Sequence, residues 1–538
     1  MFLDIPDGPV DPDGQTGNPG TGPGARHPGT GAFVNPRIVV LGLSGLSQDL
    51  IHRLGRAGWL PNLEDLLGQG GVYPLDASLP PFVDAEWTAL LAGADPGTTG
   101  FLEGSRKKAG SYFSEKASVA AFEQLSGSLF MGRPEDEALF LDVPLGGVLA
   151  EADDRDDAVR VVSRNRRGSW SEELFSAPLD RPDVLPEKPG AQGLLEDPRV
   201  FIEAMTRKTI LQGLALSCLS KRSSPALVVA AFGGLDRILS RFYRDIRLLC
   251  QGFERPGVKE PLRLFFRVLD DAVGRVLSGH RGDTLLLLVS GHGYGPLKKS
   301  LNLNAFLAER NFLALRKSGP RSALLHRVVS PILRGMGVRR EPIRRILDRI
   351  GLGRVAERVG EPLSSEIGHI DWARTRAFAL TRTGIYLNMR GTDPRGTLRP
   401  GSEARDLGEE IIRSLKGLLD PETCRPVIRD VRWREHLYDG PRTGELPHLI
   451  VSEWDPAYGI EDWRMPKPEG EVFSSPRGRT GSPVRPGFLC LPGIFPGFSF
   501  SAPLPIARIA PGIRRMLDLK TSAFPPENPH PPFMAEGV

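Results

Sequence analysis

Three chemically useful side chains each follow a short apolar run of the sequence: the hydroxyl of Ser44, the carboxylate of Asp236 and the imidazole of His292. Glycines surround all three, and little else close to them titrates. Apolar runs of this kind are typical of buried parallel strands, and ligands and catalytic groups gather beyond the carboxyl ends of such strands. The sequence therefore places a candidate site in these three loops.

The three runs are residues 38–42, 226–232 and 284–289, and we expect them to be neighbouring strands of one sheet. Apolar residues at helical spacing predict helices between them. These helices are expected over 49–67 (with a break at Pro61-Asn62), 85–92, 199–220 and 265–277. A hairpin at 376–388 and strands at 449–451 and 488–491 complete the pattern. The prediction is an α/β fold, a three-layer sandwich with a largely parallel central sheet and helices on both faces.

Composition changes along the chain suggest its organisation. Residues 1–36 are rich in Gly, Pro and Asp and are expected to form a disordered leader. The core is expected over 37–310 and 370–520, although 105–200 is loop-rich and hard to assign. Residues 311–369 are predicted to be a mostly helical cap insertion, and the Pro-rich residues 521–538 a loose tail.

The cap insertion is strongly basic. Residues 316–358 hold 12 Lys/Arg and three acidic residues, interleaved with apolar residues at helical spacing, whereas the net charge of the 538-residue chain is only +4. One interpretation is a weak contact with anionic membranes; the other is a solvated helical insertion that lies on the core. The small net charge gives no reason to expect specific nucleic-acid binding.

The four cysteines are far apart in the sequence and form no CxxC pair, so neither a cysteine-rich zinc site nor a disulfide framework is expected. No signal-peptide pattern and no apolar run of about 20 residues is present. The expected location is the cytoplasm, although a mature form whose signal had been removed would look the same.

Several motifs, in order, resemble those of the alkaline-phosphatase superfamily, in its type I phosphodiesterase/nucleotide pyrophosphatase branch. The resemblance runs from about Arg37 to Leu519. The motifs that carry it include Pro61-Asn-Leu, Pro80-Pro81, Trp87-Thr88, Pro96-Gly97, Leu301-Asn-Leu-Asn304, Ile370-Asp-Trp372, Ile385-Tyr-Leu-Asn388, Asp420-Pro-Glu-Thr423 and Gly440-Pro441. The resemblance implies an alkaline-phosphatase-like fold. It also implies a site with two zinc ions and a Thr or Ser nucleophile.

The residues of that site are mostly replaced in this chain. Of seven family positions, two metal ligands are retained, Asp236 and His292. The nucleophile position is Val83, which has no nucleophilic atom. The remaining four positions, all family metal ligands, are Ser44, Ser240, Gly291 and Pro483. Further family motifs are altered at Thr99-Gly100, Pro447-His448 and Arg508–Gly512.

Two retained ligands, one for each ion, are too few for a stable zinc site. Asp84, Glu86 and His448 could in principle rebuild one, but nothing in the sequence places these three together. We instead expect Asp236 to cap the helix beginning near Arg237, and His292 to bond loop backbone. Val83 and Gly291 then suit a site closed on apolar or empty space, because buried carboxylates without metal are costly.

The sequence therefore predicts a catalytically degenerate member of the family, a pseudoenzyme with no catalytic residue and no bound metal. Such a chain would act by binding a protein partner or a small phosphate-containing ligand. The first alternative is an active phosphodiester or phosphate-ester hydrolase with an unconventional site and two zinc ions. The second is a peripheral binder of anionic surfaces that uses the basic insertion. Gly42-Leu-Ser44-Gly45 is better explained by the family's Gly-Leu-Asp-Gly pattern than by a serine-hydrolase elbow.

Overall fold

The computed structural model describes twelve stretches of the chain. They are residues 37–77, 79–116, 138–143, 159–164, 170–175, 197–223, 225–278, 284–316, 370–460, 471–476, 478–492 and 503–518. The leader 1–36, nearly all of the cap insertion 311–369 and the tail 521–538 lie outside these residues, so the predictions made for them stay predictions.

The larger sheet is built around strand β1 (Arg37–Gly42), as the apolar runs predict. It pairs in parallel with β8 (Leu227–Ala231) on one side and with β9 (Thr284–Ser290) on the other. In register, Leu41 is opposite both Ala230 and Leu288. The carboxyl ends of these strands therefore meet at one edge, where Ser44, Asp236 and His292 follow.

The sheet has nine strands in the order β20-β2-β19-β9-β1-β8-β5-β6-β7. The outer strands are β20 (Leu504–Pro505), β2 (Val72–Asp76), β19 (Gly487–Cys490), β5 (Ala138–Leu141), β6 (Val159–Arg164) and β7 (Trp170–Phe175). Pairing is antiparallel only at β19 and β6, so these two strands run against the other seven. The prediction of a largely parallel central sheet is confirmed.

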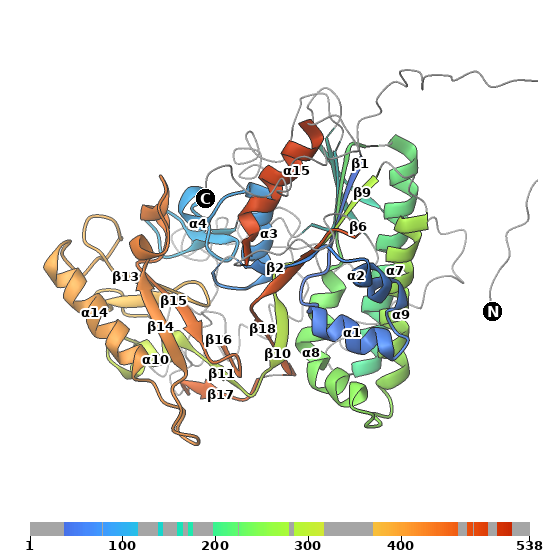
Figure 1. Ribbon diagram of the computed structural model, residues 1–538. Helices are drawn as coiled ribbons and strands as arrows, with labels where there is room; N and C mark the ends of the chain where they lie inside the picture. The colour runs from blue at the N-terminus through green and yellow to red at the C-terminus, as the bar shows by residue number, and fades with distance from the viewer. Residues whose placement is uncertain are drawn as a thin grey trace, which may run out of the picture. The chain divides into compact units, whose positions relative to one another are not determined.

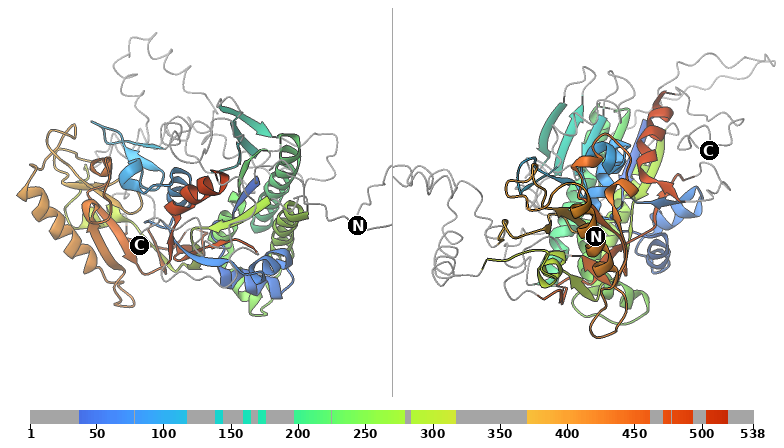
Figure 2. Two further views of the ribbon diagram at one scale, coloured as in Figure 1. Left: turned by 45° about the horizontal axis from the view of Figure 1, so that its top comes forward. Right: turned by 90° about the vertical axis from the view of Figure 1, so that its left-hand side faces the viewer.

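Helices cover both faces of this sheet. Val39 and Leu41 of β1 pack into a cluster with one set of helices, and Ile38 and Val40 pack into a second cluster on the other face. The first set is α1 (Gln48–Arg56), α2 (Pro61–Gly68), α7 (Pro198–Ser223), α8 (Gly233–Cys250) and α9 (Lys259–Ser278). The second set is α3 (Val83–Ala92) and α15 (Ile509–Asp518). Figures 1 and 2 show α7 and α9 on one side of the strands and α15 on the other.

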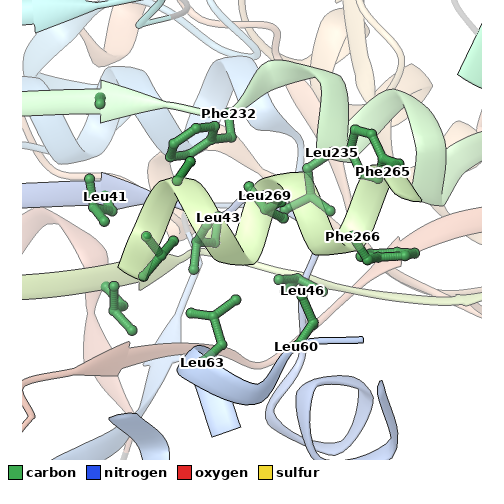
Figure 3. Packing of buried hydrophobic residues seen from close by; sticks show 14 of the residues in the cluster. Leu41, Leu43, Leu46, Leu60, Leu63, Phe232, Leu235, Phe265, Phe266 and Leu269 are labelled. Carbon is green, nitrogen blue, oxygen red and sulfur yellow. The ribbon is translucent and has the colours of Figure 1, made fainter. Parts of the chain in front are cut away.

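In the first cluster, alternate residues of the strands meet the apolar faces of the helices. Leu41, Phe232, Leu235 of α8 and Leu269 of α9 all belong to this cluster, and all are buried (Figure 3). Burying a side chain of this size contributes about 1.5–3 kcal/mol. The shared burial fixes the first turn of α8, which carries Asp236, against the end of β1.

A second sheet lies in the later part of the chain, with strand order β12-β13-β15-β14 and antiparallel pairing throughout. Its strands are β12 (Ala377–Ala379), β13 (Gly384–Leu387), β14 (Ile428–Trp433) and β15 (Leu449–Trp454). They share a hydrophobic cluster with α10 (Leu303–Glu309) and α14 (Ser402–Lys416). The predicted hairpin at 376–388 is β12–β13.

Short pieces connect these parts. They are α4 (Pro96–Thr99), hairpin β3 (Ser105–Lys107) and β4 (Ser114–Lys116), pair β10 (Gly293–Pro296) and β18 (Gly481–Val484), and the set β11 (Lys299–Leu301), β16 (Tyr458–Ile460) and β17 (Phe473–Ser474). Each predicted helix is present with small shifts in its ends, and the break at Pro61 separates α1 from α2. Among the described residues, no helix is long and apolar enough to cross a membrane.

Candidate functional site

The seven family positions gather around the edge of the larger sheet that the sequence predicts. Ser44 follows β1, Val83 is the first residue of α3, and Gly291 and His292 follow β9. Asp236 and Ser240 lie one helical turn apart on α8. Pro483 lies in β18, directly opposite Tyr294 of β10. Hydrogen bonds and close polar contacts join Ser44, Gly291, His292 and Asp236 into one network, and its centre is a residue outside the seven, Glu86.

Glu86 enters the site from the first turn of α3, and only 1% of it is exposed. Its Oε1 accepts hydrogen bonds from the Gly291 backbone N–H at 2.7 Å and from Ser44 Oγ at 3.1 Å. Its Oε2 lies 2.8 Å from His292 Nδ1. Glu86 thus has three partners from two strand ends, and the helix N-terminus behind it also favours a negative charge.

Gly291 has to be a glycine because the Glu86 side chain occupies the space beside it. A Cβ atom at position 291 would lie 2.5 Å from both Cγ and Cδ of Glu86. Real Cβ contacts are never this short, so a side chain at 291 and the present position of Glu86 exclude each other. The carboxylate that the family pattern carries at position 291 is absent, and a carboxylate from α3 fills the adjoining volume.

His292 is fully buried between two carboxylates. Its Nδ1 faces Glu86, and its Nε2 lies 3.4 Å from Asp236 Oδ1. Burial lowers the pKa of His292, but the hydrogen bonds to Asp236 and Glu86 outweigh burial and raise the pKa to about 9. The raised pKa favours the imidazolium form of the ring, which can donate from both nitrogens.

Asp236 does not cap α8, so that prediction is wrong. The helix begins at Gly233 with Phe232 as its N-cap residue, and no side chain caps it. Asp236 Oδ1 instead accepts from the Tyr294 hydroxyl at 2.8 Å and faces His292. Burial and the Asp236 charge raise the pKa of Tyr294 well above its ordinary value, while a hydrogen bond with Ser240 lowers it. Tyr294 therefore stays a neutral donor.

The prediction that His292 bonds loop backbone is wrong for its ring, because both ring nitrogens face carboxylates. The prediction of a site closed on apolar or empty space is also wrong. Ser44 Oγ accepts from the indole Nε1 of Trp87 at 3.2 Å and donates to Glu86. Val83 does pack, partly buried, against the apolar cluster beneath α3. The buried carboxylate is tolerated because an imidazolium and two further donors compensate its charge.

The residues present do not fit a two-zinc centre. Val83 and Gly291 offer no side-chain donor, and Pro483 offers none either. Both ring nitrogens of His292 face carboxylates, Glu86 at Nδ1 and Asp236 at Nε2, so neither nitrogen is open to a metal ion in this arrangement. Within the described stretches, no group of three or more His, Cys, Asp or Glu could hold a metal ion. Of the three possible replacement ligands, Glu86 lies in the site, Asp84 is exposed and His448 bonds the Leu387 backbone.

Sequence reasoning did not single out Tyr294, and it named Trp87 and Glu86 without placing either of them in this network. Tyr294 is two residues after His292, in β10, and both side chains contact Asp236 Oδ1. That spacing is a signal that could have found it. Glu86 was recognisable as an acid between the apolar residues Ala85 and Trp87, but its partners are 42 and 205 or more positions away.

No protein-family model matches the sequence, and no curated protein matches it. Several solved structures are similar in fold. The phosphonoacetate hydrolase of Sinorhizobium meliloti has a TM-score of 0.44 and 11% identity, covering 90% of this chain and 96% of that one. The alkaline phosphatase PafA has 0.44 and 10%, covering 91% and 97%. The human ectonucleotide pyrophosphatase/phosphodiesterase 5 has 0.42 and 9%, covering 90% and 95%.

The identity to each of these structures is 11% or less and each TM-score is below 0.5, so these similarities assign no role to any residue of this chain.

Proposed function

We propose that this chain is a catalytically degenerate member of the type I phosphodiesterase/nucleotide pyrophosphatase family that acts by binding. The observation that carries the proposal is the Glu86 carboxylate, packed beside Gly291 and paired with His292. The His292 ring lies between the carboxylates of Glu86 and Asp236, and its raised pKa favours a positive charge that offsets theirs. The bound molecule would be a protein partner or a small phosphate-containing ligand.

The same contacts speak against hydrolysis by the residues that remain. Two of the seven positions carry a hydroxyl group, Ser44 and Ser240. Ser44 is almost fully buried. Its oxygen already accepts from Trp87 and its proton already goes to Glu86. Both ring nitrogens of His292 already face carboxylates, so neither is open to take a proton from a substrate or a water molecule. A substrate would reach neither group without breaking the network.

Metal content and turnover test this proposal together. The full chain, dialysed against zinc and then against metal-free buffer, is expected to retain no stoichiometric zinc and to leave bis(p-nitrophenyl) phosphate intact. Any residual hydrolysis should be equally fast in the His292→Gln variant prepared in the same way, because a rate common to both proteins comes from a contaminating enzyme. About two equivalents of retained zinc, with turnover that His292→Gln abolishes, would establish the active-hydrolase alternative instead.

A further inference from the structure

A separate cavity of about 660 Å³ lies outside the network around His292. Its walls are the β3–β4 hairpin, the segment that follows β13, and the residues around the start of β15. None of Ser44, Glu86, Asp236, His292 or Tyr294 lines it. A cavity of this volume suits a small organic molecule.

Three donors meet in this cavity: Lys107, Arg434 and His448. His448 Nδ1 accepts the backbone N–H of Leu387 at 3.2 Å, so a neutral ring carries its proton on the other nitrogen. Burial, and after it the charges of Arg434 and Lys107, lower the pKa of His448 to about 3. The imidazole is thus neutral at physiological pH, and it lies close to two cations.

The carboxylates of the cavity do not balance its cations. Four cations line it, Arg106, Lys107, Arg390 and Arg434, against three carboxylates. Glu115 and Glu445 both pair with Arg106, and Asp393 pairs with Lys107. That pairing uses all three carboxylates of the lining.

The other two cations make different contacts. Arg434 contacts Glu435, which is largely exposed and outside the lining, and two backbone carbonyls. Arg390 donates its Nε to the Thr397 carbonyl at 3.0 Å. Two guanidinium groups therefore face the cavity without a carboxylate from its walls. Guanidinium groups recognise phosphate and carboxylate through paired N–H donors.

Apart from Thr392, the remaining side chains of the lining are apolar or aromatic. It includes Met389, Leu446 and the ring of Tyr386, and the Lys107 ammonium lies 5.8 Å from that ring's centre. We propose that this cavity binds a small organic anion. Its phosphate or carboxylate would lie against Arg434, Arg390 and the His448 N–H, and its apolar body against Tyr386 and Met389. The proposal goes beyond the function proposed above and holds whether or not the His292 site is catalytic.

Calorimetric titration of the full chain with phenyl phosphate, benzoate and phenol tests this inference. Phenyl phosphate or benzoate is expected to bind, and the tighter of the two identifies the anionic group; phenol is expected to bind much more weakly. Arg390→Glu should weaken binding at least about tenfold, because an exposed guanidinium becomes a repelling carboxylate. His448→Asn, whose amide oxygen can still accept from Leu387, should also weaken it.

Arg395→Glu is the matched control, because Arg395 is exposed, lies five residues from Arg390 and does not line the cavity. It should change the affinity by less than about twofold, well below the tenfold expected for Arg390→Glu. Absence of binding by both anions would overturn the inference, as would equal affinity of the Arg390→Glu and Arg395→Glu variants. Phenol binding as tightly as phenyl phosphate would also overturn it, since the cavity would then select only for an apolar ring.

Discussion

Replacing Gly291 with Asp is expected to lower the free energy of unfolding by about 3 kcal/mol, because a new side chain would overlap Glu86 and add a second buried carboxylate. The Cβ atom alone would lie 2.5 Å from Glu86 Cγ and Cδ. Much of this loss should be recovered by adding Glu86→Ala. The helix side chain then vacates the volume, and the new carboxylate can pair with His292 in its place.

Urea denaturation of the two single variants, the double variant and the unmodified chain measures this coupling. Glu86→Ala alone should also destabilise, because it leaves an imidazolium with one fewer partner. The double variant is expected to be more stable than the sum of the single effects predicts, by about 1–3 kcal/mol.

Gly233→Asp is the control, because position 233 is exposed and no atom lies within 4 Å of the point that a Cβ atom there would occupy. It should change stability by less than about 0.5 kcal/mol. If the changes in unfolding free energy at positions 86 and 291 were additive, the two side chains would not compete for the same space.

Stability is expected to fall as the pH rises above neutrality, because His292 loses its charge there. The pKa of His292 is raised in the folded chain to about 9 from an ordinary value of 6.5. The ion pairs with Glu86 and Asp236 therefore stabilise the fold fully below about pH 6.5 and are lost as the pH passes through about 9. This difference in pKa corresponds to a loss of roughly 3 kcal/mol in the free energy of unfolding between pH values below 6.5 and pH values above 9.

Other groups also titrate in this range, so the comparison with a variant isolates the contribution of His292. Glu86→Gln keeps the shape of the side chain and removes its charge, which lowers the pKa of His292. The stability difference between the unmodified chain and Glu86→Gln is expected to be large at pH 6.5 and to shrink towards pH 10. Urea midpoints measured across this range give the difference directly. Parallel curves for the two proteins would show that the Glu86–His292 ion pair does not form.

The sequence was sufficient to predict the three central strands of the larger sheet, and residues that follow these strands lie together at one edge. Apolar runs at 38–42, 226–232 and 284–289 are long enough to be recognised as buried strands, and they are neighbours in the sheet. Strands β5, β6 and β7 were not predicted, because each is a run of four to six residues inside a loop-rich region. They form strands because β5 pairs with β8, β6 with β5 and β7 with β6. The sequence does not show this pairing.

The missing residues of the site have a similar explanation. Ala85, Trp87, Ala89, Leu90 and Leu91 make α3 apolar on nearly every side, so the periodicity does not show which face meets the strand ends. Only the fold places Glu86 beside Gly291. The glycine at 291 leaves free the space that the Glu86 side chain occupies, and the sequence alone does not show that the two positions adjoin.

The protonation state of His292 tests the central claim most directly. Nitrogen-15 NMR of the imidazole rings at pH 7.5, with the His292 signals assigned by their loss in His292→Gln, distinguishes a doubly protonated ring from a neutral one. The expected result is two protonated nitrogens whose shifts do not change when two equivalents of zinc are added. A neutral His292, with one nitrogen shifted by zinc, would contradict this account and restore the metal-dependent hydrolase.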